Sequence, residues 1–265
     1  MDYEDRLIIY IDILGFTNFI NYTSETRVNS SNKILRISNF LNLVKKFFTV
    51  NDITLSKTRQ VTSFSDLIVV SINLNEIENI DLEIKEIFYL LLTSYLNGFL
   101  LRGSIVYGKL IHTENTLFGP GLINAYDRER TMAKFPRIII DDVIVSDLLD
   151  LENISKLPQN CKDFIFRDSD GVYYIDIFYS IRENVDNFWE YLQLIKSICN
   201  ILIDMMDNPL LKEKYLWLKD KFVLHINKNK QIFKHYLEND ITKDDLEVIK
   251  MMIYEIDKNE AKKML

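Results

Sequence analysis

Glycine and proline are scarce in this chain, whose 265 residues include seven glycines and four prolines. Average usage of about 7% and 5% would give roughly eighteen and thirteen. Collagen-like and low-complexity sequences are rich in these residues, so both classes are excluded. Six glycines fall within the first 121 residues, the seventh is Gly171, and none follows it. We therefore expect the turns and close backbone contacts that need glycine to lie in the first two thirds of the chain.

Cysteine, histidine and long apolar runs are also rare. Cys161 and Cys199 form no CxxC pair, and with three histidines in the chain a zinc site is not expected. Free thiols indicate a reducing, cytoplasmic environment. Apolar runs such as residues 87–92 are far shorter than the roughly 18 residues of a membrane span. The acidic segment 1–7 predicts no secretory signal.

An excess of basic residues is missing as well, because 32 Lys and Arg stand against 39 Asp and Glu, a net charge of −7. A protein that binds nucleic acid along its surface needs a basic face, so this class is disfavoured. An acidic protein can still bind one anionic nucleotide through metal ions and a few arginines. Such a metal would be a hard cation held by carboxylates. The 48% of hydrophobic residues suffices for a large core and excludes disorder.

Strand and helix patterns alternate in the first 180 residues. Strands are predicted at 6–13, 58–64, 67–72, 99–107, 108–113, 137–140, 164–167 and 172–178. Helices are predicted directly after Gly15 and at 32–48, 82–97 and 121–133, with a loop at 115–120. Beyond residue 180 the patterns are helical, at 185–206, 210–226, 230–237 and 243–261. We therefore predict an α+β domain at 1–180 and a helical region at 181–265.

The first candidate for chemistry is Asp12, which ends a run of isoleucines. An unpartnered carboxylate in such surroundings is costly, so a metal ion, an arginine or helix amides must compensate it. Gly15 lets the backbone turn, and the amides of Phe16 and Thr17 would then begin a helix and cradle an anion. The alternative is that Asp12 merely caps the strand end.

Asp66 lies in the predicted turn between two strands, where aspartate is common for structural reasons alone. Together with Asp12 it gains a second interpretation. Two carboxylates at adjacent strand ends, one beside an anion cradle, can hold two metal ions for in-line chemistry at a phosphorus atom.

Asn124 and Arg128 are four residues apart and therefore share one face of a predicted helix. An amide and a guanidinium side by side suit a ribose and a charged α-phosphate. The alternative is a solvated helix whose residues 127–130 form weak surface ion pairs. Arg102 and Arg137 are possible phosphate contacts, or else pair within the structure.

Four phrases, YIDILGF, SFSDLIVVS, RGSIVYG and FGPGLINAYDRE, occur in this order along the chain. The set resembles the catalytic domain of class III nucleotidyl cyclases. The resemblance implies a ferredoxin-like fold with a central, mostly antiparallel sheet and flanking helices. It implies two Mg²⁺ or Mn²⁺ ions on Asp12, Asp66 and the backbone carbonyl of Ile13. It also implies a head-to-tail homodimer in which Asn124 and Arg128 act from the partner subunit.

Further phrases, LLRGSIVYG, MAKFPRIIID, DGVYYIDIF and KYLWL, are similar to the Pycsar antiphage cyclases over residues 7 to about 220. That resemblance implies synthesis of cyclic UMP or cyclic CMP, a second messenger that activates a separate effector protein. Thr62 and Leu117 stand where purine cyclases place their base-reading lysine or glutamate and their aspartate. A small hydroxyl residue suits a pyrimidine edge, and Tyr126 either stacks on the base or packs. The phosphate-binding lysine of purine cyclases has no clear counterpart after Gly171.

The sequence thus predicts a phosphorus–oxygen lyase that converts UTP, or as second choice CTP, to the 3′,5′-cyclic monophosphate and pyrophosphate. A purine (adenylate or guanylate) cyclase with rearranged base contacts is one alternative. A non-catalytic, cyclase-like regulatory domain that binds nucleotide is another. A palm-type polymerase or oligonucleotide cyclase is a third, which the acidic charge balance disfavours.

Overall fold

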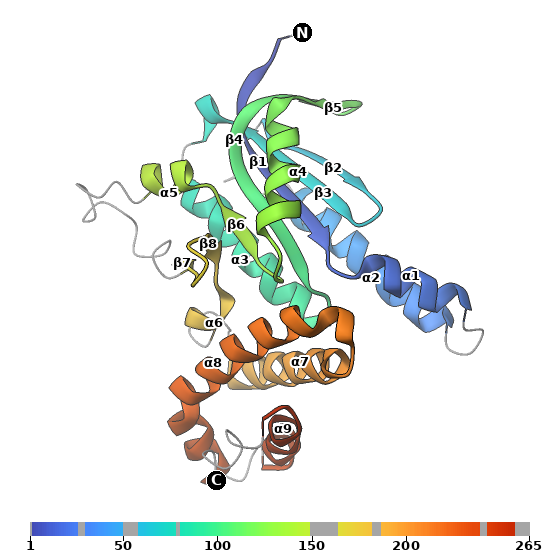
Figure 1. Cartoon of the computed structure of the whole chain (residues 1–265), viewed down its shortest axis with the longest axis vertical. Helices are drawn as coiled ribbons and strands as arrows, with labels where there is room; N and C mark the ends of the chain where they lie inside the picture. Colours follow the sequence, from blue (N-terminus) through green and yellow to red (C-terminus); the bar gives the residue numbers. More distant parts are fainter. Residues whose placement is uncertain are drawn as a thin grey trace. The chain divides into compact units, whose positions relative to one another are not determined.

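The computed structural model describes residues 2–25, 30–49, 58–77, 80–148, 164–181, 187–238 and 243–257. The chain divides into two compact units, one formed by Met1–Leu91 and Phe99–Asp176 and the other by Leu92–Gly98 and Ile177–Leu265. The first unit carries the sheet and the second is helical (Figure 1). No helix among the described residues is long and apolar enough to cross a membrane. Cys199 is a buried free thiol, and Cys161 lies outside the described residues.

Eight strands form the sheet of the first unit, in the spatial order β2-β3-β1-β4-β6-β8-β7 with β5 paired to β4 off this path. The strands are β1 (Glu4–Ile13), β2 (Gln60–Phe64), β3 (Leu67–Asn73), β4 (Leu101–Thr113), β5 (Thr116–Phe118), β6 (Ile138–Ile140), β7 (Ile165–Arg167) and β8 (Tyr173–Ile175). Only the β4–β6 pair of these described strands is parallel. The predicted α+β class with a central, mostly antiparallel sheet is confirmed.

Helices lie on both faces of this sheet. The helices that follow or connect its strands are α1 (Phe16–Glu25), α2 (Ser30–Thr49), α3 (Ile80–Leu96), α4 (Pro120–Met132) and α5 (Asp142–Leu148), with a short 3₁₀ turn at Leu74–Glu76. Figure 1 shows α4 in front of β1 and β4, and α3 behind the sheet. Pro120 opens α4, where its fixed φ suits a helix start and its missing N–H is no loss. The predicted stop before Pro136 is confirmed, since the helix ends at Met132.

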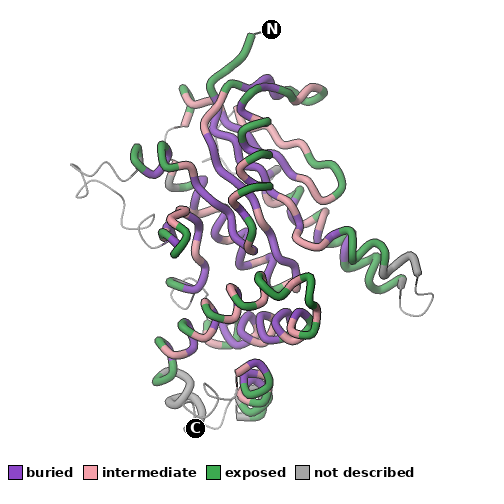
Figure 2. The backbone as a smooth tube through the Cα atoms, viewed as in Figure 1, coloured by how far each residue is buried: buried purple, intermediate pink, exposed green. Residues whose placement is uncertain are grey.

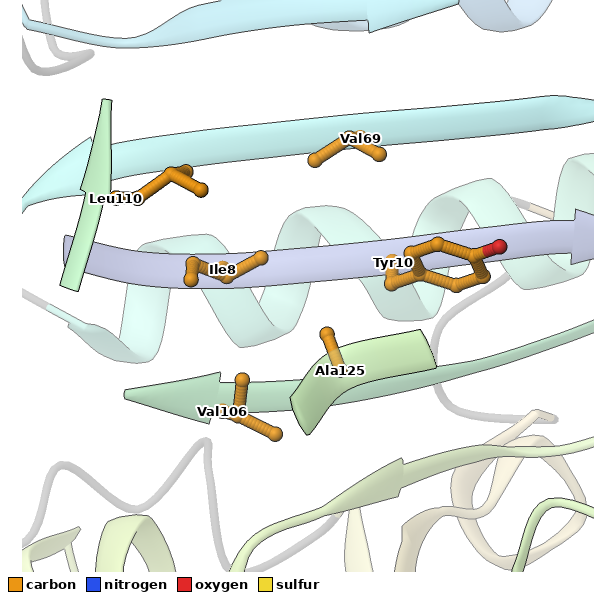
Figure 3. Packing of buried hydrophobic residues seen from close by; sticks show 6 residues of the cluster. All are labelled: Ile8, Tyr10, Val69, Val106, Leu110 and Ala125. Atoms are coloured by element: carbon orange, nitrogen blue, oxygen red, sulfur yellow. The ribbon is translucent and has the colours of Figure 1, made fainter. Parts of the chain in front are cut away.

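The central strand β1 is buried on both faces, so residues 7–11 are an unbroken apolar run (Figure 2). Ile8 and Tyr10 face α4 and pack with Val69 and Ala125 (Figure 3). We call this side of the sheet the α4 face. Two glycines bring α4 this close, because a Cβ on Gly108 would lie 2.5 Å from the Cα of Gly121.

The second unit is built from helices in its described part. They are α6 (Ile177–Ser180), α7 (Phe188–Met206), α8 (Lys212–Glu238) and α9 (Lys243–Ile256), with a 3₁₀ turn at Pro209–Leu211. A side of α7 is apolar and buried, which is typical of an amphipathic helix in a bundle. His225 is buried in this unit and is within 2.7 Å of both the Tyr191 hydroxyl and the Phe178 carbonyl oxygen.

Several predicted element boundaries are wrong, for identifiable reasons. Strand β4 runs unbroken through Gly108, because this glycine makes room for α4 and does not turn the chain. The predicted loop at 115–120 contains β5, which folds back on β4. The predicted strand at 172–178 is β8 followed by α6, the helices predicted at 210–226 and 230–237 form one helix, and α5 was not predicted. In each case pairing or packing with distant residues overrides the local pattern.

Candidate functional site

Asp12 lies on the α4 face of the sheet. It is opposite Leu67 of β3 and Arg102 of β4, and Leu67 is in turn opposite Phe64 of β2. Residues directly opposite each other in an antiparallel ladder share a face. This row of four side chains therefore crosses the sheet beside the β2–β3 turn that carries Asp66.

The carboxylates of Asp12 and Asp66 lie close together. Burial raises the pKa of Asp12, and Asp66 raises it further through its negative charge and a side-chain hydrogen bond, while Arg102 acts in the opposite direction. The Asp12 side chain is 20% exposed, so the cost of desolvating it is substantial. The structure therefore brings these two carboxyl groups together, and their role as metal ligands stays a prediction. Two carboxyl groups side by side are ligands that a hard divalent cation prefers.

Arg102 is the cation that Asp12 contacts. Its Nε lies 2.8 Å from Asp12 Oδ2 and 2.8 Å from Glu129 Oε1. The Glu129 side chain is 4% exposed, and Oε1 accepts no hydrogen bond from the described residues although it touches the guanidinium. Burial raises the pKa of Glu129, which Arg102 opposes. Arg102, predicted as a possible phosphate contact, is thus shared between two carboxylates.

Glu129 is a residue that sequence reasoning missed. The alternative interpretation of 127–130 as a solvated stretch fits Asp127 and Arg130, an exposed pair 3.9 Å apart. It does not fit Glu129, which follows Gly121 and Ala125 at four-residue spacing on the buried side of α4. This four-residue spacing is the feature of the sequence that could have identified Glu129 as buried.

The predicted anion cradle falls at the N-terminus of α1, which begins directly after Gly15. Gly15 has φ +79°, a left-handed conformation that favours glycine. The first helical hydrogen bonds run from the amides of Asn18 and Phe19 to the Gly15 carbonyl oxygen. The amides of Phe16 and Thr17 precede these bonds and therefore remain available at the helix N-terminus. Ile13, whose carbonyl is an expected metal ligand, is the last residue of β1 and is buried.

Asn124 and Arg128 lie on the outward side of α4. Asn124 is exposed, and Arg128 Nη2 is 2.9 Å from Asp141 Oδ2 just after β6. Within the described part of the chain, neither side chain pairs with Asp12 or Asp66. One chain therefore does not bring the predicted catalytic pair and the predicted metal ligands into contact.

The three residues predicted to contact the base lie on the α4 face. Thr62 belongs to the row next to that of Asp12, because it is opposite Val69, which is opposite Tyr10. The ring of Tyr126 meets that of Tyr10 edge-on, with centroids 6.1 Å apart. Leu117 packs against the apolar cluster containing Tyr10. Burial raises the pKa of Tyr10 to about 12, with Glu129 and Asp12 adding to the effect.

Arg137 is placed differently. It is 1% exposed, and its Nη1 lies 2.5 Å from Asp168 Oδ2 while Nη2 pairs with Asp170. These ion pairs link the residue directly before β6 to the turn between β7 and β8. We therefore leave Arg137 out of the proposed site.

Hard oxygen ligands are available for a divalent ion. Asp12 and Asp66 offer carboxylates and Ile13 a backbone carbonyl, a donor set that fits Mg²⁺ or Mn²⁺. Among the described residues there is no group of three or more His, Cys, Asp or Glu side chains suited to holding a metal.

No protein-family model and no curated protein matches the sequence. Similar solved structures include the adenylyl cyclase CyaB from P. aeruginosa, at 16% identity and a TM-score of 0.41, with 66% of this chain and 94% of that chain covered. The guanylyl cyclase Cya2 is 14% identical with a TM-score of 0.43, over 66% of this chain and 92% of that one. At such values the likeness assigns neither a family nor an activity to this chain.

Proposed function

We propose that this chain is a nucleotidyl cyclase that converts a pyrimidine nucleoside triphosphate, UTP first and CTP second, to the 3′,5′-cyclic monophosphate and pyrophosphate. The observation that carries the proposal is the pair of carboxylates of Asp12 and Asp66 beside the amides at the start of α1. Ligands for divalent cations next to an anion cradle are what in-line attack at the α-phosphorus requires.

Asp12, Asp66 and the Ile13 carbonyl would hold two Mg²⁺ or Mn²⁺ ions. When bound, these ions neutralise the triphosphate and lower the pKa of the ribose 3′-hydroxyl. The amides of Phe16 and Thr17 hold phosphate oxygens at the positive end of α1. In the reaction the 3′-oxygen loses its proton to water and bonds to the α-phosphorus. The bond from that phosphorus to the bridging oxygen breaks, and pyrophosphate leaves.

Arg102 and Glu129 prepare Asp12 for this task. Burial raises the pKa of Asp12, and the Arg102 guanidinium opposes that rise and so favours the charged carboxylate. Glu129, on the other side of the guanidinium, holds Arg102 in place. Arg102 and Glu129 thus hold the Asp12 carboxylate in a fixed position at the end of β1.

Asn124 and Arg128 require a second copy of the chain, because one chain does not place them near the aspartates. In a head-to-tail homodimer, Asn124 orients the ribose and Arg128 stabilises the charge on the α-phosphate in the transition state. Large apolar side chains are exposed where such a partner would sit: Phe64 beside the Asp66 turn is 78% exposed and Ile123 of α4 is 63% exposed. Exposed apolar surface of this kind is typical of an interface.

The product serves as a second messenger for a separate effector protein in antiphage defence, and the enzyme works in the cytoplasm without nucleic acid. This part of the proposal is supported by the sequence resemblance alone.

Incubation with each of the four nucleoside triphosphates and Mn²⁺, followed by chromatography, tests the proposal. We expect a cyclic pyrimidine nucleotide and pyrophosphate from the wild type, and none from Asp66→Asn. Asp127→Asn, on an exposed carboxylate of α4, is the matched control and should retain full turnover. Cyclic AMP or cyclic GMP as the main product would establish a purine cyclase instead.

A non-catalytic nucleotide-binding domain is the second candidate, and the pairing of Asp12 with Arg102 favours it. In that case the salt bridge would persist, and nucleotide would bind without turnover. Binding of UTP measured by calorimetry, with no product from any of the four triphosphates, would select this candidate.

A further inference from the structure

A chain of hydrogen bonds connects the buried Arg6 of β1 to Thr62 of β2. Arg6 Nε donates to Ser71 Oγ at 2.8 Å, Ser71 Oγ lies 2.8 Å from His112 Nδ1, and His112 Nε2 lies 2.9 Å from Thr62 Oγ1. The first three residues are buried, at 3%, 0% and 6% exposure, and Thr62 is half-buried. We call these four residues the Arg6–Thr62 relay. It starts at the guanidinium of Arg6, which is always charged, and ends at the Thr62 hydroxyl on the α4 face.

The direction of each hydrogen bond in the relay follows from its first member. A guanidinium can only donate, so Ser71 Oγ accepts from Arg6. The Ser71 hydroxyl proton then needs an acceptor of its own, and His112 Nδ1 is the acceptor within reach. His112 must therefore carry its proton on Nε2, which donates to Thr62 Oγ1.

The opposite tautomer leaves a defect. If His112 Nδ1 carried the proton, Ser71 Oγ would accept twice, and its own fully buried hydroxyl proton would have no acceptor among the described residues. An unsatisfied buried donor costs about 1–3 kcal/mol. Burial and the charge of Arg6 also lower the pKa of His112 to about 4, so the ring is neutral near pH 7 and one of its nitrogens must accept.

Thr62 is therefore left with a hydroxyl proton to give. Its Oγ1 accepts from His112, and the hydroxyl has no other hydrogen-bond partner among the described residues. Leu117 is opposite His112 in the β4–β5 ladder, so the residue paired with His112 is apolar and offers no side-chain hydrogen bond. Thr62 thus presents a donor, with its direction fixed, one row away from Asp12 on the same face.

We propose that His112 is a positioning residue that fixes the Thr62 hydroxyl as a donor to the nucleobase, and that this donor selects the C4 carbonyl of uracil over the C4 amino group of cytosine. The inference rests on the proposed cyclase function. A carbonyl accepts the hydroxyl proton. The cytosine amino group would face that donor with a donor of its own and leave both unpaired.

Steady-state rates with UTP and with CTP test the inference in matched pairs of variants. Thr62→Val removes the hydroxyl and keeps the shape, and Thr62→Ser keeps the hydroxyl. His112→Phe removes the donor to Thr62, and His112→Gln keeps one. We expect Thr62→Val and His112→Phe to lower kcat/KM for UTP about tenfold, with less than about a twofold change for CTP. Thr62→Ser and His112→Gln should retain the preference for UTP.

The double variant separates positioning from mere structure. Because His112 acts through Thr62, adding His112→Phe to Thr62→Val should cost no further discrimination between UTP and CTP. An equal loss for both substrates in His112→Phe would overturn the inference, and so would unchanged discrimination in Thr62→Val. Should His112→Phe fail to fold, the two Thr62 variants and His112→Gln still decide.

Failure of the proposed function has a different signature. A wild type that makes no cyclic product from any triphosphate refutes the cyclase itself. A wild type that cyclises UTP and CTP equally well leaves the cyclase intact and refutes the role of the relay.

Discussion

Arg102 lies between two carboxylates that are both largely removed from water, and neither pairs with another cation among the described residues. Burying an ion pair contributes little net stability, but deleting one partner leaves an uncompensated buried charge. Arg102→Ala should therefore lower the free energy of unfolding by about 2–4 kcal/mol, less than for a fully buried pair because Asp12 keeps some exposure. Urea unfolding in the absence of divalent ions measures this loss.

A second substitution tests whether charge is the cause. Glu129→Gln in the Arg102→Ala background removes one of the two orphaned charges, so it should restore part of the lost stability. Glu129→Gln alone should destabilise the protein only slightly, since Asp12 still pairs with Arg102. A double variant less stable than Arg102→Ala would show that packing, and not charge, dominates at this position.

His225 makes the free energy of unfolding depend on pH in the acid range. Its Nδ1–H donates to the Phe178 carbonyl oxygen, and its Nε2 accepts from the Tyr191 hydroxyl. Burial lowers its pKa to about 4, against 6.5 for the unfolded chain. Between these values the unfolded state binds a proton that the folded state does not, so His225 makes the protein less stable as pH falls from 6.5 to 4.

The measurement is the free energy of unfolding against pH for wild type and His225→Gln. The difference between the two curves should change between pH 6.5 and 4 and be flat above pH 7. Carboxylates titrate in the same range but are common to both proteins, so they cancel. Parallel curves would mean that the folded ring accepts the proton freely.

Some residues of the candidate site are visible in the sequence and others are not. Asp12 and Asp66 stand out because a carboxylate next to an apolar run is costly without a partner. Glu129 and His112 are ordinary residues in their own segments. Their importance comes from partners 27 and 50 positions away, Arg102 and Thr62, and sequence patterns do not reveal such pairings.

At the scale of elements, the approach of α4 to the sheet decides where its polar residues lie. Gly108 of β4 faces Gly121 of α4, and a Cβ on Gly108 would come within 2.5 Å of the Gly121 Cα. That neighbour is backbone and cannot rotate away. Gly108→Ala should therefore push α4 outward, at a cost of about 1–3 kcal/mol.

Displacement of α4 has a functional consequence, because this helix carries Asn124, Arg128 and Glu129. Gly108→Ala should lower kcat more than it raises KM for the nucleotide, since the proposed mechanism has Asn124 and Arg128 act mainly in the transition state. Asp127→Ala on the exposed side of α4 is the control and should change neither stability nor kcat. Normal kcat in Gly108→Ala would show that the helix position tolerates the shift.

The order of strands and helices along the chain was predicted better than the residues at which they begin and end. The sequence contains the alternation of strands and helices, because apolar periodicity is local. It does not contain the reason why β4 passes through Gly108 unbroken, which is the contact with Gly121, or why Thr116–Phe118 becomes β5, which is its pairing with Ile111–Thr113. Both depend on residues brought together by the fold.

At the scale of the whole molecule, the proposed homodimer places each active site between two copies. In that proposal each chain supplies Asp12 and Asp66 to one site and Asn124 and Arg128 to the other. Homodimers of Asp66→Asn and of Arg128→Ala should therefore both be inactive. The first lacks a metal ligand in both sites, and the second lacks the catalytic arginine in both sites. In a mixed dimer one site carries both defects and the other carries none.

Mixing the two inactive variants is therefore expected to restore activity. If subunits exchange freely, half of the dimers are mixed and each has one intact site, so about a quarter of the wild-type turnover should return. Co-expression with two different affinity tags and tandem purification raises the fraction of mixed dimers and should bring turnover to about half. Asp66→Asn mixed with Asp12→Asn is the control and should stay inactive, because each of the two sites in the mixed dimer then lacks one of its aspartates. An inactive mixed dimer of Asp66→Asn and Arg128→Ala would mean that Arg128 acts, if at all, within its own chain, where it pairs with Asp141.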